Sequence, residues 1–91
     1  MSRPVWADQA EETERIFRDL TPSKLRVFAL IVEGLSNKEI AQRLNRTEQS
    51  IKNDLRCVYI ATGTANARQL LALTYKNADL LDALRENLTQ K

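Results

Sequence analysis

The stretch of residues 35–55, LSNKEIAQRLNRTEQSIKNDL, decides the fold. It contains two short runs with the apolar spacing of α-helices, and only the dipeptide NR separates them. Ser36 is followed three residues later by Glu39, which is the pattern of a capping box at a helix start. Thr47 is placed to cap the next helix directly after the short connection. The stretch therefore predicts two consecutive helices held at a tight angle to each other.

The second of these helices has polar and apolar side chains on opposite sides. At about 100° per residue, its long polar side chains span roughly 100° of the circumference: Gln49, Lys52, Asn53 and Arg56. Three apolar side chains fall on the other side: Ile51, Leu55 and Val58. Basic and amide side chains can hydrogen-bond base edges, so the pair predicts a helix-turn-helix whose second helix enters the major groove of DNA. A solvated face in a small helical bundle is the alternative interpretation.

Helix starts and stops are also legible elsewhere. Thr21 and Asn66 are placed to cap the N-termini of helices. Gly34 and Gly63 can end helices in the left-handed conformation. Apolar residues spaced by three and four predict amphipathic helices over residues 6–19 and 79–88, and a fifth helix over about 67–76. Because no segment has the period of a strand, the predicted fold class is all-α, a four-helix core with additional N-terminal and C-terminal helical segments.

Composition excludes several classes of function. The chain has 91 residues, the length of one domain, with 43% hydrophobic and 29% charged residues. There is one cysteine and no histidine, which excludes internal disulfides, Cys/His zinc sites and Ser-His-Asp triads. Two glycines are too few for a glycine-rich phosphate loop. No apolar run reaches the ~18 residues of a membrane span. We therefore expect a cytoplasmic protein that is not an enzyme and uses no metal or cofactor.

Charge is concentrated in the middle of the chain, although the net charge is only +2. Residues 1–20 carry three basic and five acidic groups, and residues 77–91 carry two and three. Residues 36–68 carry six basic groups against three acidic ones. This local excess of positive charge coincides with the predicted helix pair, as an anionic partner such as double-stranded DNA would require.

The segments LTPSKLRVFALIVEGLSNKEIAQRL, TEQSIKNDL and TGTAN resemble the LuxR/NarL-type helix-turn-helix domain over roughly residues 20–76. The resemblance implies a bacterial four-helix DNA-binding domain that regulates transcription as a dimer. It implies base reading by Lys52, Asn53 and Arg56, to which the helix wheel adds Gln49. It also implies phosphate contacts at Lys38 and at the helix start at Thr47, and two further basic residues complete that candidate set: Arg46 and Arg68.

The chain departs from this family pattern at several positions. The family usually has acidic residues where Lys24 and Arg26 stand, and a histidine where Asp54 stands. It usually has basic residues at the positions of Ala61 and Ala67. Fewer cations and an added anion predict weaker binding to DNA phosphates. A helix-turn-helix that binds protein instead of DNA is therefore an alternative interpretation.

The expected organisation has three parts: an amphipathic helix in residues 1–19, the helix-turn-helix domain in residues 20–77, and an amphipathic helix or tail in residues 78–91. In the family, the helix corresponding to about 67–76 forms the dimer. Leucines of this helix and the tail are therefore the candidate homodimer interface: Leu70, Leu73, Leu81, Leu84 and Leu88. The alternative is that the tail folds back over Trp6 and Phe17.

Three functions fit these observations. The first is a stand-alone DNA-binding transcription regulator, since no receiver or sensor domain precedes the helix pair. The second is a protein-interaction module, such as an anti-activator or an adaptor, with another transcription regulator or RNA polymerase as partner. The third is the promoter-reading region of a sigma factor, which shares the pattern LTPSKLRVFALI followed by GLSNKEIA but would lack a region that binds the polymerase core.

Overall fold

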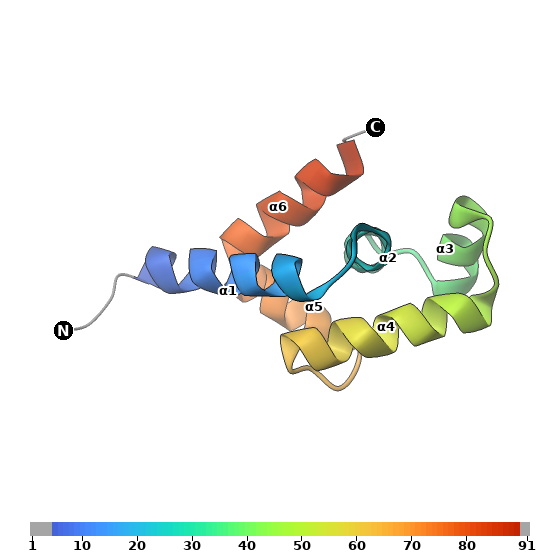
Figure 1. Ribbon diagram of the computed structural model, residues 1–91, viewed down its shortest axis with the longest axis horizontal. Coiled ribbons are helices and arrows are strands. Elements are labelled where there is room, and N and C mark those ends of the chain that lie inside the picture. The colour runs from blue at the N-terminus through green and yellow to red at the C-terminus, as the bar shows by residue number, and fades with distance from the viewer. Residues whose placement is uncertain (1–4, 90–91) are drawn as a thin grey trace.

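The computed structural model describes the backbone of residues 5–89 and the side chains of residues 9–89. This part of the chain forms six helices: α1 (Val5–Asp19), α2 (Pro22–Val32), α3 (Asn37–Leu44), α4 (Glu48–Thr62), α5 (Ala67–Lys76) and α6 (Ala78–Thr89). The described residues contain no strand, and the predicted all-α class is confirmed. Figure 1 shows α2 end-on at the centre, with α1 and α6 on one side, α3 on the other, and α4 running beneath.

The predicted helix starts are confirmed by hydrogen bonds. The Thr21 hydroxyl accepts from the Lys24 N–H at 3.3 Å, and Pro22 occupies the first turn of α2. Ser36 and Glu39 form the complete capping box, with the Glu39 N–H donating to the Ser36 hydroxyl and the Ser36 N–H donating to the Glu39 carboxylate. The other two caps accept from the third residue of their helices: Thr47 and Asn66. Each cap satisfies a backbone donor that has no partner within its helix.

The predicted helix stops are also found. Gly34 follows α2 with φ of +99°, and Gly63 ends α4 with φ of +71°. These left-handed conformations favour glycine, because a Cβ would be strained there. Asn77, which was not foreseen as a cap, accepts from the Leu80 N–H at 3.0 Å and starts α6 one residue earlier than expected. The turn at Asn77 therefore folds α6 back from α5.

Two hydrophobic clusters hold the helices together. The first joins α1, α2, α5 and α6 to the C-terminal half of α4: Ile16, Leu20, Leu25, Phe28, Ala29, Val58, Leu70, Leu80 and Leu84. The second joins α2, α3 and the N-terminal half of α4: Val27, Leu30, Ile40, Ala41, Ile51 and Leu55. Each fully buried Val, Leu, Ile or Phe side chain contributes about 1.5–3 kcal/mol relative to an exposed one. The α2 and α4 helices contribute side chains to both clusters. These two helices therefore connect the α3–α4 pair to the first cluster.

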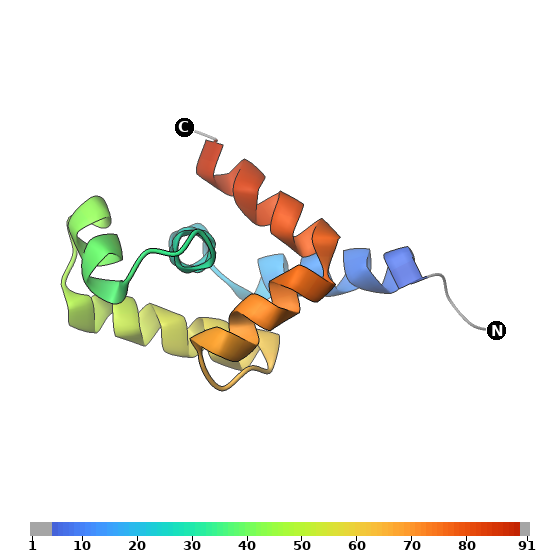
Figure 2. The same ribbon diagram turned by 180° about the vertical axis from the view of Figure 1, so that it is seen from behind.

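The terminal segments are part of this single packed unit. The α1 helix is joined to the far end of α4 by Arg15, whose guanidinium donates to the Ala61 carbonyl at 3.1 Å. At the α5–α6 junction, the Asn77 side chain donates to the Gln9 carbonyl of α1 at 3.3 Å. The expected boundaries at 19/20 and 77/78 therefore coincide with helix ends but not with a break in packing. Figure 2 shows α5 and α6 from the opposite side.

Two of the leucines assigned to a dimer interface have no surface to offer a second copy. Leu70 is fully buried and Leu84 is 1% exposed, and both pack inside the single chain. The reason is that α6 folds against α1 and α2, which is the folded-back arrangement that the sequence left open. Phe17 packs against the same cluster, whereas the side chain of Trp6 lies outside the described residues. The other three candidates are half-buried: Leu73, Leu81 and Leu88.

Candidate nucleic-acid interface

The connection between α3 and α4 is a tight turn. Asn45 adopts the left-handed conformation with φ of 55° and ψ of 50°, which asparagine tolerates better than most side chains. The Arg46 N–H then donates to the Ala41 carbonyl at 2.8 Å, so the turn is closed by the backbone of α3. Thr47 caps α4 at the next residue, with its hydroxyl accepting from the Ser50 N–H at 3.1 Å. The start of α4 is therefore fixed relative to the end of α3.

The reading face of α4, which we define as Gln49, Lys52, Asn53 and Arg56, is exposed in the structure. The three apolar residues predicted to lie opposite are buried: Ile51, Leu55 and Val58. Gln49 donates to the Asn53 side-chain oxygen at 3.1 Å, which aligns the two amides along the helix. Within the described part of the chain, neither Lys52 nor Arg56 has an acidic partner in a salt bridge. The face therefore presents two uncompensated cations and two amides to solvent.

Three of the four candidate phosphate contacts are exposed, but they lie on different elements. Lys38 is exposed in the first turn of α3. Thr47 is exposed at the N-terminus of α4, where backbone N–H groups and the helix dipole favour anions. Arg68 is exposed in the first turn of α5, outside the helix-turn-helix. Lys38 and Thr47 thus belong to the same two-helix unit as the reading face, whereas Arg68 does not.

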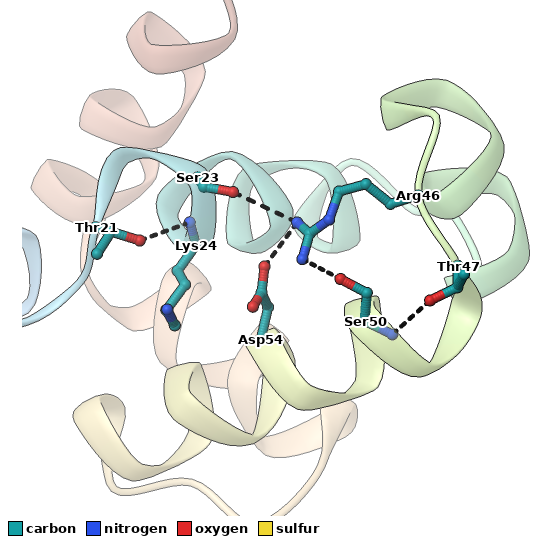
Figure 3. Close-up of polar contacts among 7 residues, drawn as sticks. All are labelled: Thr21, Ser23, Lys24, Arg46, Thr47, Ser50 and Asp54. Atoms are coloured by element: carbon teal, nitrogen blue, oxygen red, sulfur yellow. Dashed lines mark hydrogen bonds and ion pairs between the residues drawn. The ribbon is translucent and has the colours of Figure 1, made fainter.

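Arg46 differs from the expectation, because its side chain turns inward rather than outward (Figure 3). Its Nη1 lies 2.7 Å from Asp54 Oδ2 and donates to the Ser23 hydroxyl at 3.4 Å. Its Nη2 donates to the Ser50 hydroxyl. The side chains of Arg46 and Asp54 are only 27% and 12% exposed. The assignment of Arg46 to phosphate binding is therefore corrected: the guanidinium is committed to partners within the protein.

The role predicted for Asp54 is corrected for the same reason. The sequence suggested an anion that would weaken the grip on DNA, but the carboxylate is buried beside Arg46 and away from the reading face. A signal was present in the sequence: on the helix wheel Asp54 lies about 200° from Lys52, at the edge of the apolar side. A buried carboxylate needs a charged or hydrogen-bonding partner. The partner could not be identified, because Arg46 lies in the turn and outside helical spacing rules.

Ile60 is a second feature that the sequence reasoning missed. It is 76% exposed, and at about 80° on the same wheel it lies in line with the reading face, one turn beyond Arg56. Beside it, an open groove of about 460 Å³ has both polar and apolar walls: Asn37, Lys52, Leu55, Arg56, Tyr59, Ile60, Thr64 and Ala65. The reading face therefore continues into an apolar surface at its C-terminal end.

Electrostatics at the start of α3 are set by the capping box. Hydrogen bonds from the Ser36 backbone N–H, and then from the Ser36 hydroxyl, hold the pKa of Glu39 below its ordinary value.

No group of three or more potential ligands that could hold a metal ion occurs among the described residues. None of the helices in this part of the chain is long and apolar enough to cross a membrane.

Comparison with known proteins identifies the family of this two-helix unit. A family model described as "Sigma-70, region 4" matches residues 10–56, which run from α1 through the reading face on α4. Two curated relatives, from Mycobacterium bovis and Mycobacterium tuberculosis, each carry the name "Putative HTH-type transcriptional regulator" and are 42% identical over 52 residues. The aligned region covers 57% of this chain but only 6% of each relative. No solved structure matches the chain.

These matches support the helix-turn-helix but not the LuxR/NarL type that the sequence suggested. The family model extends upstream of that resemblance into α1 and stops before α5, the helix that the LuxR/NarL resemblance assigned to dimer formation. The matched residues include the capped α3, the tight turn and the reading face as far as Arg56. Since the match spans more than half of the chain, the protein belongs to the sigma-70 region 4 family of helix-turn-helix domains.

Proposed function

We propose that the chain is a sequence-specific DNA-binding regulator of transcription that inserts α4 into the major groove. The single observation that carries the proposal is the reading face: two cations without acidic partners among the described residues and two amides, exposed opposite a fully buried apolar face. Arginine, lysine, asparagine and glutamine are the side chains that discriminate base pairs in the major groove. The role is binding rather than catalysis, and a bacterial cytoplasm is the compartment that it implies.

Phosphate contacts would flank the reading face on the helix-turn-helix itself. Lys38 and the N-terminus of α4 at Thr47 are the groups best placed for this role, because both are exposed on the α3–α4 unit. Such contacts fix the orientation of the protein on DNA but carry no sequence information. Arg68 would contribute only if α5 also approached the duplex.

Two modes of action follow from the resemblance and from the family. A LuxR/NarL-type regulator would bind as a homodimer, whereas a sigma-like protein would read promoter DNA beside RNA polymerase. Family membership favours the second mode, since the matched model is sigma-70 region 4. The number of copies on DNA separates the two.

The homodimer has support from the outer surface of α5. Tyr75 is 78% exposed, and Leu71, one turn before it, is only half-buried. Residues spaced by four lie on the same side of a helix, so these two side chains form an apolar stripe that is at least partly exposed. A single DNA-binding module buries only about 600–1,000 Å² on DNA, and twofold pairing would double its contacts. A dimer interface at Leu71 and Tyr75 would differ from the one expected from the sequence, which included the buried Leu70 and Leu84.

The DNA-binding proposal is tested by selection of sites from randomised duplexes with the purified chain. Alanine substitutions of Lys52, Asn53 and Arg56 should each relax sequence preference, since one good base contact contributes about 1–3 kcal/mol of discrimination. Arg18→Ala is the matched control, because it removes an exposed cation from α1 and should leave the selected sites unchanged. Absence of duplex binding by the wild type at low salt would refute the proposal.

A protein-interaction module remains the second candidate function, and Ile60 favours it. An exposed apolar side chain in line with the reading face is suited to a protein surface as well as to DNA. Of the two reasons that the sequence gave for this alternative, the anion at Asp54 is removed by its pairing with Arg46, whereas the missing cations at positions 61 and 67 remain. Co-purification of another transcription regulator or an RNA polymerase subunit, abolished by Ile60→Asp and accompanied by no DNA binding, would establish this candidate instead.

A further inference from the structure

We propose that Arg46 is a positioning residue, which sets the direction of the reading face by holding Asp54 and does not contact DNA. The proposal rests on the proposed DNA-binding function and deepens it. Arg46 is the only side chain of the described residues whose polar contacts reach both the first turn of α2 and two successive turns of α4. It therefore connects the support of the reading face to the reading face itself.

The contacts of Arg46 restrain α4 at two levels along its axis. Ser50 and Asp54 are four residues apart on the same side of α4, and the guanidinium contacts both. Ser23 at the start of α2 provides the third contact, on the other side of the guanidinium (Figure 3). A guanidinium presents its donors in a rigid planar fork, which fixes the relative placement of all three partners. Rotation or sliding of α4 would break at least one contact.

Small rotations of α4 matter for base recognition. Asp54 follows Asn53 directly and lies two residues from both Lys52 and Arg56, so whatever holds Asp54 also holds them. Side-chain tips lie about 5–6 Å from a helix axis, so a rotation of about 10° moves them by roughly 1 Å. Hydrogen bonds tolerate only about 0.5 Å of variation in donor–acceptor distance. Loss of the restraint should therefore weaken base contacts without removing any base-contacting group.

Charge separates this role from a phosphate contact. The positive charge of Arg46 is compensated by Asp54 at 2.7 Å, and its side chain is largely covered. A compensated guanidinium releases no counterion from DNA, so its removal should not change the dependence of binding on salt. Lys38 is an exposed cation, and among the described residues it has no salt bridge to an acidic side chain. The two roles thus predict different results in one experiment.

The experiment measures affinity for two probes: the duplex ranked first in selection by the wild type, and poly(dI-dC) as a non-specific duplex. Arg46→Lys and Asp54→Asn should each lower the ratio of specific to non-specific affinity by about tenfold, the loss of roughly one good base contact. Arg46→Lys keeps the positive charge, so the slope of affinity against salt is read on the double variant Arg46→Gln/Asp54→Asn, which removes both charges and should leave the slope unchanged. The double variant should lose no more than either single variant, because the two residues act as one unit. Arg43→Lys, on the exposed side of α3, is the matched control and should have no effect.

Other results would overturn the proposal in recognisable ways. Equal weakening on both probes with a salt slope smaller by about one would make Arg46 a phosphate contact. An unchanged affinity ratio in variants that remain folded by circular dichroism would show that the pair has no positioning role. Additive losses in the double variant would mean two independent contacts. A wild type that binds neither probe would refute the proposed DNA-binding function itself. A wild type that binds, with variants that keep their specificity, would refute only the positioning role of Arg46.

Discussion

Replacing Leu84 with alanine tests whether α6 belongs to the core of the single chain. Leu84 is 1% exposed and packs in the cluster that contains Ile16 and Phe28. Leucine-to-alanine changes at such sites cost about 2–5 kcal/mol, because transfer energy is lost and a cavity remains. The α6 helix packs against α1, α2 and α5, so collapse of the cavity is restricted and we expect about 3 kcal/mol. That is a large share of the roughly 5–15 kcal/mol that stabilises a domain.

Thermal unfolding followed by circular dichroism gives the assay. In a domain of this size, each kcal/mol corresponds to a shift in Tm of about 4–8 °C, so Leu84→Ala should lower Tm by roughly 12–24 °C. Leu81→Ala on the same helix is the control, since Leu81 is half-buried and should cost less than half as much. Because the cavity lies within one chain, the destabilisation should be independent of protein concentration. Unchanged stability together with loss of a dimer would refute the packing of α6 and restore Leu84 to an interface.

Three further predictions concern other parts of the molecule. Hydrogen bonds to Ser36 lower the pKa of Glu39 from 4.5 in the folded protein. The ionised carboxylate therefore stabilises the fold at pH values above the pKa of the unfolded chain. This contribution is lost as the pH falls through the pKa of the folded protein. The stability difference between wild type and Glu39→Gln should therefore be present at neutral pH and disappear in acid; a difference that is constant with pH would contradict this. Lys38→Ala should weaken specific and non-specific DNA binding alike and reduce the salt slope by about one, whereas a loss confined to certain base positions would make Lys38 a base contact. If α5 forms a homodimer, light scattering should give twice the 10.4 kDa chain mass, and Tyr75→Asp should return it to one chain mass; a wild-type monomer on DNA would support the sigma-like mode instead.

Local features of the fold were predictable because they depend on residues close together in the sequence. The caps at Thr21, Ser36 and Thr47 each join a side chain to a backbone group three residues away, so the residue type and its position suffice. The placement of α6 was not predictable in this way. Its leucines fit a dimer seam or an intramolecular core equally well, and the choice depends on the turn at Asn77 and its contact with Gln9, 68 residues away.

The candidate site divides along the same line. The helix wheel correctly placed the reading face in solvent, because the buried side of α4 has a clear apolar pattern. It could not place Arg46, whose partners lie on α2 and α4 while its own backbone lies in the turn. Ile60 was missed for a different reason: it is a single apolar residue on the polar side of α4, and it belongs neither to the apolar stripe nor to the set of long polar side chains.

The most direct test of base reading by α4 is an NMR titration of the ¹⁵N-labelled chain with its selected duplex at low salt. If α4 reads the major groove, the largest shifts should occur in the backbone and side-chain resonances of the reading face, with smaller shifts at Lys38 and Thr47. Resonances of α6, which packs against α1 and α2 away from α3, should be unchanged. Shifts that are absent throughout, or that concentrate on α5 and α6 while Lys52, Asn53 and Arg56 remain unperturbed, would contradict the central claim.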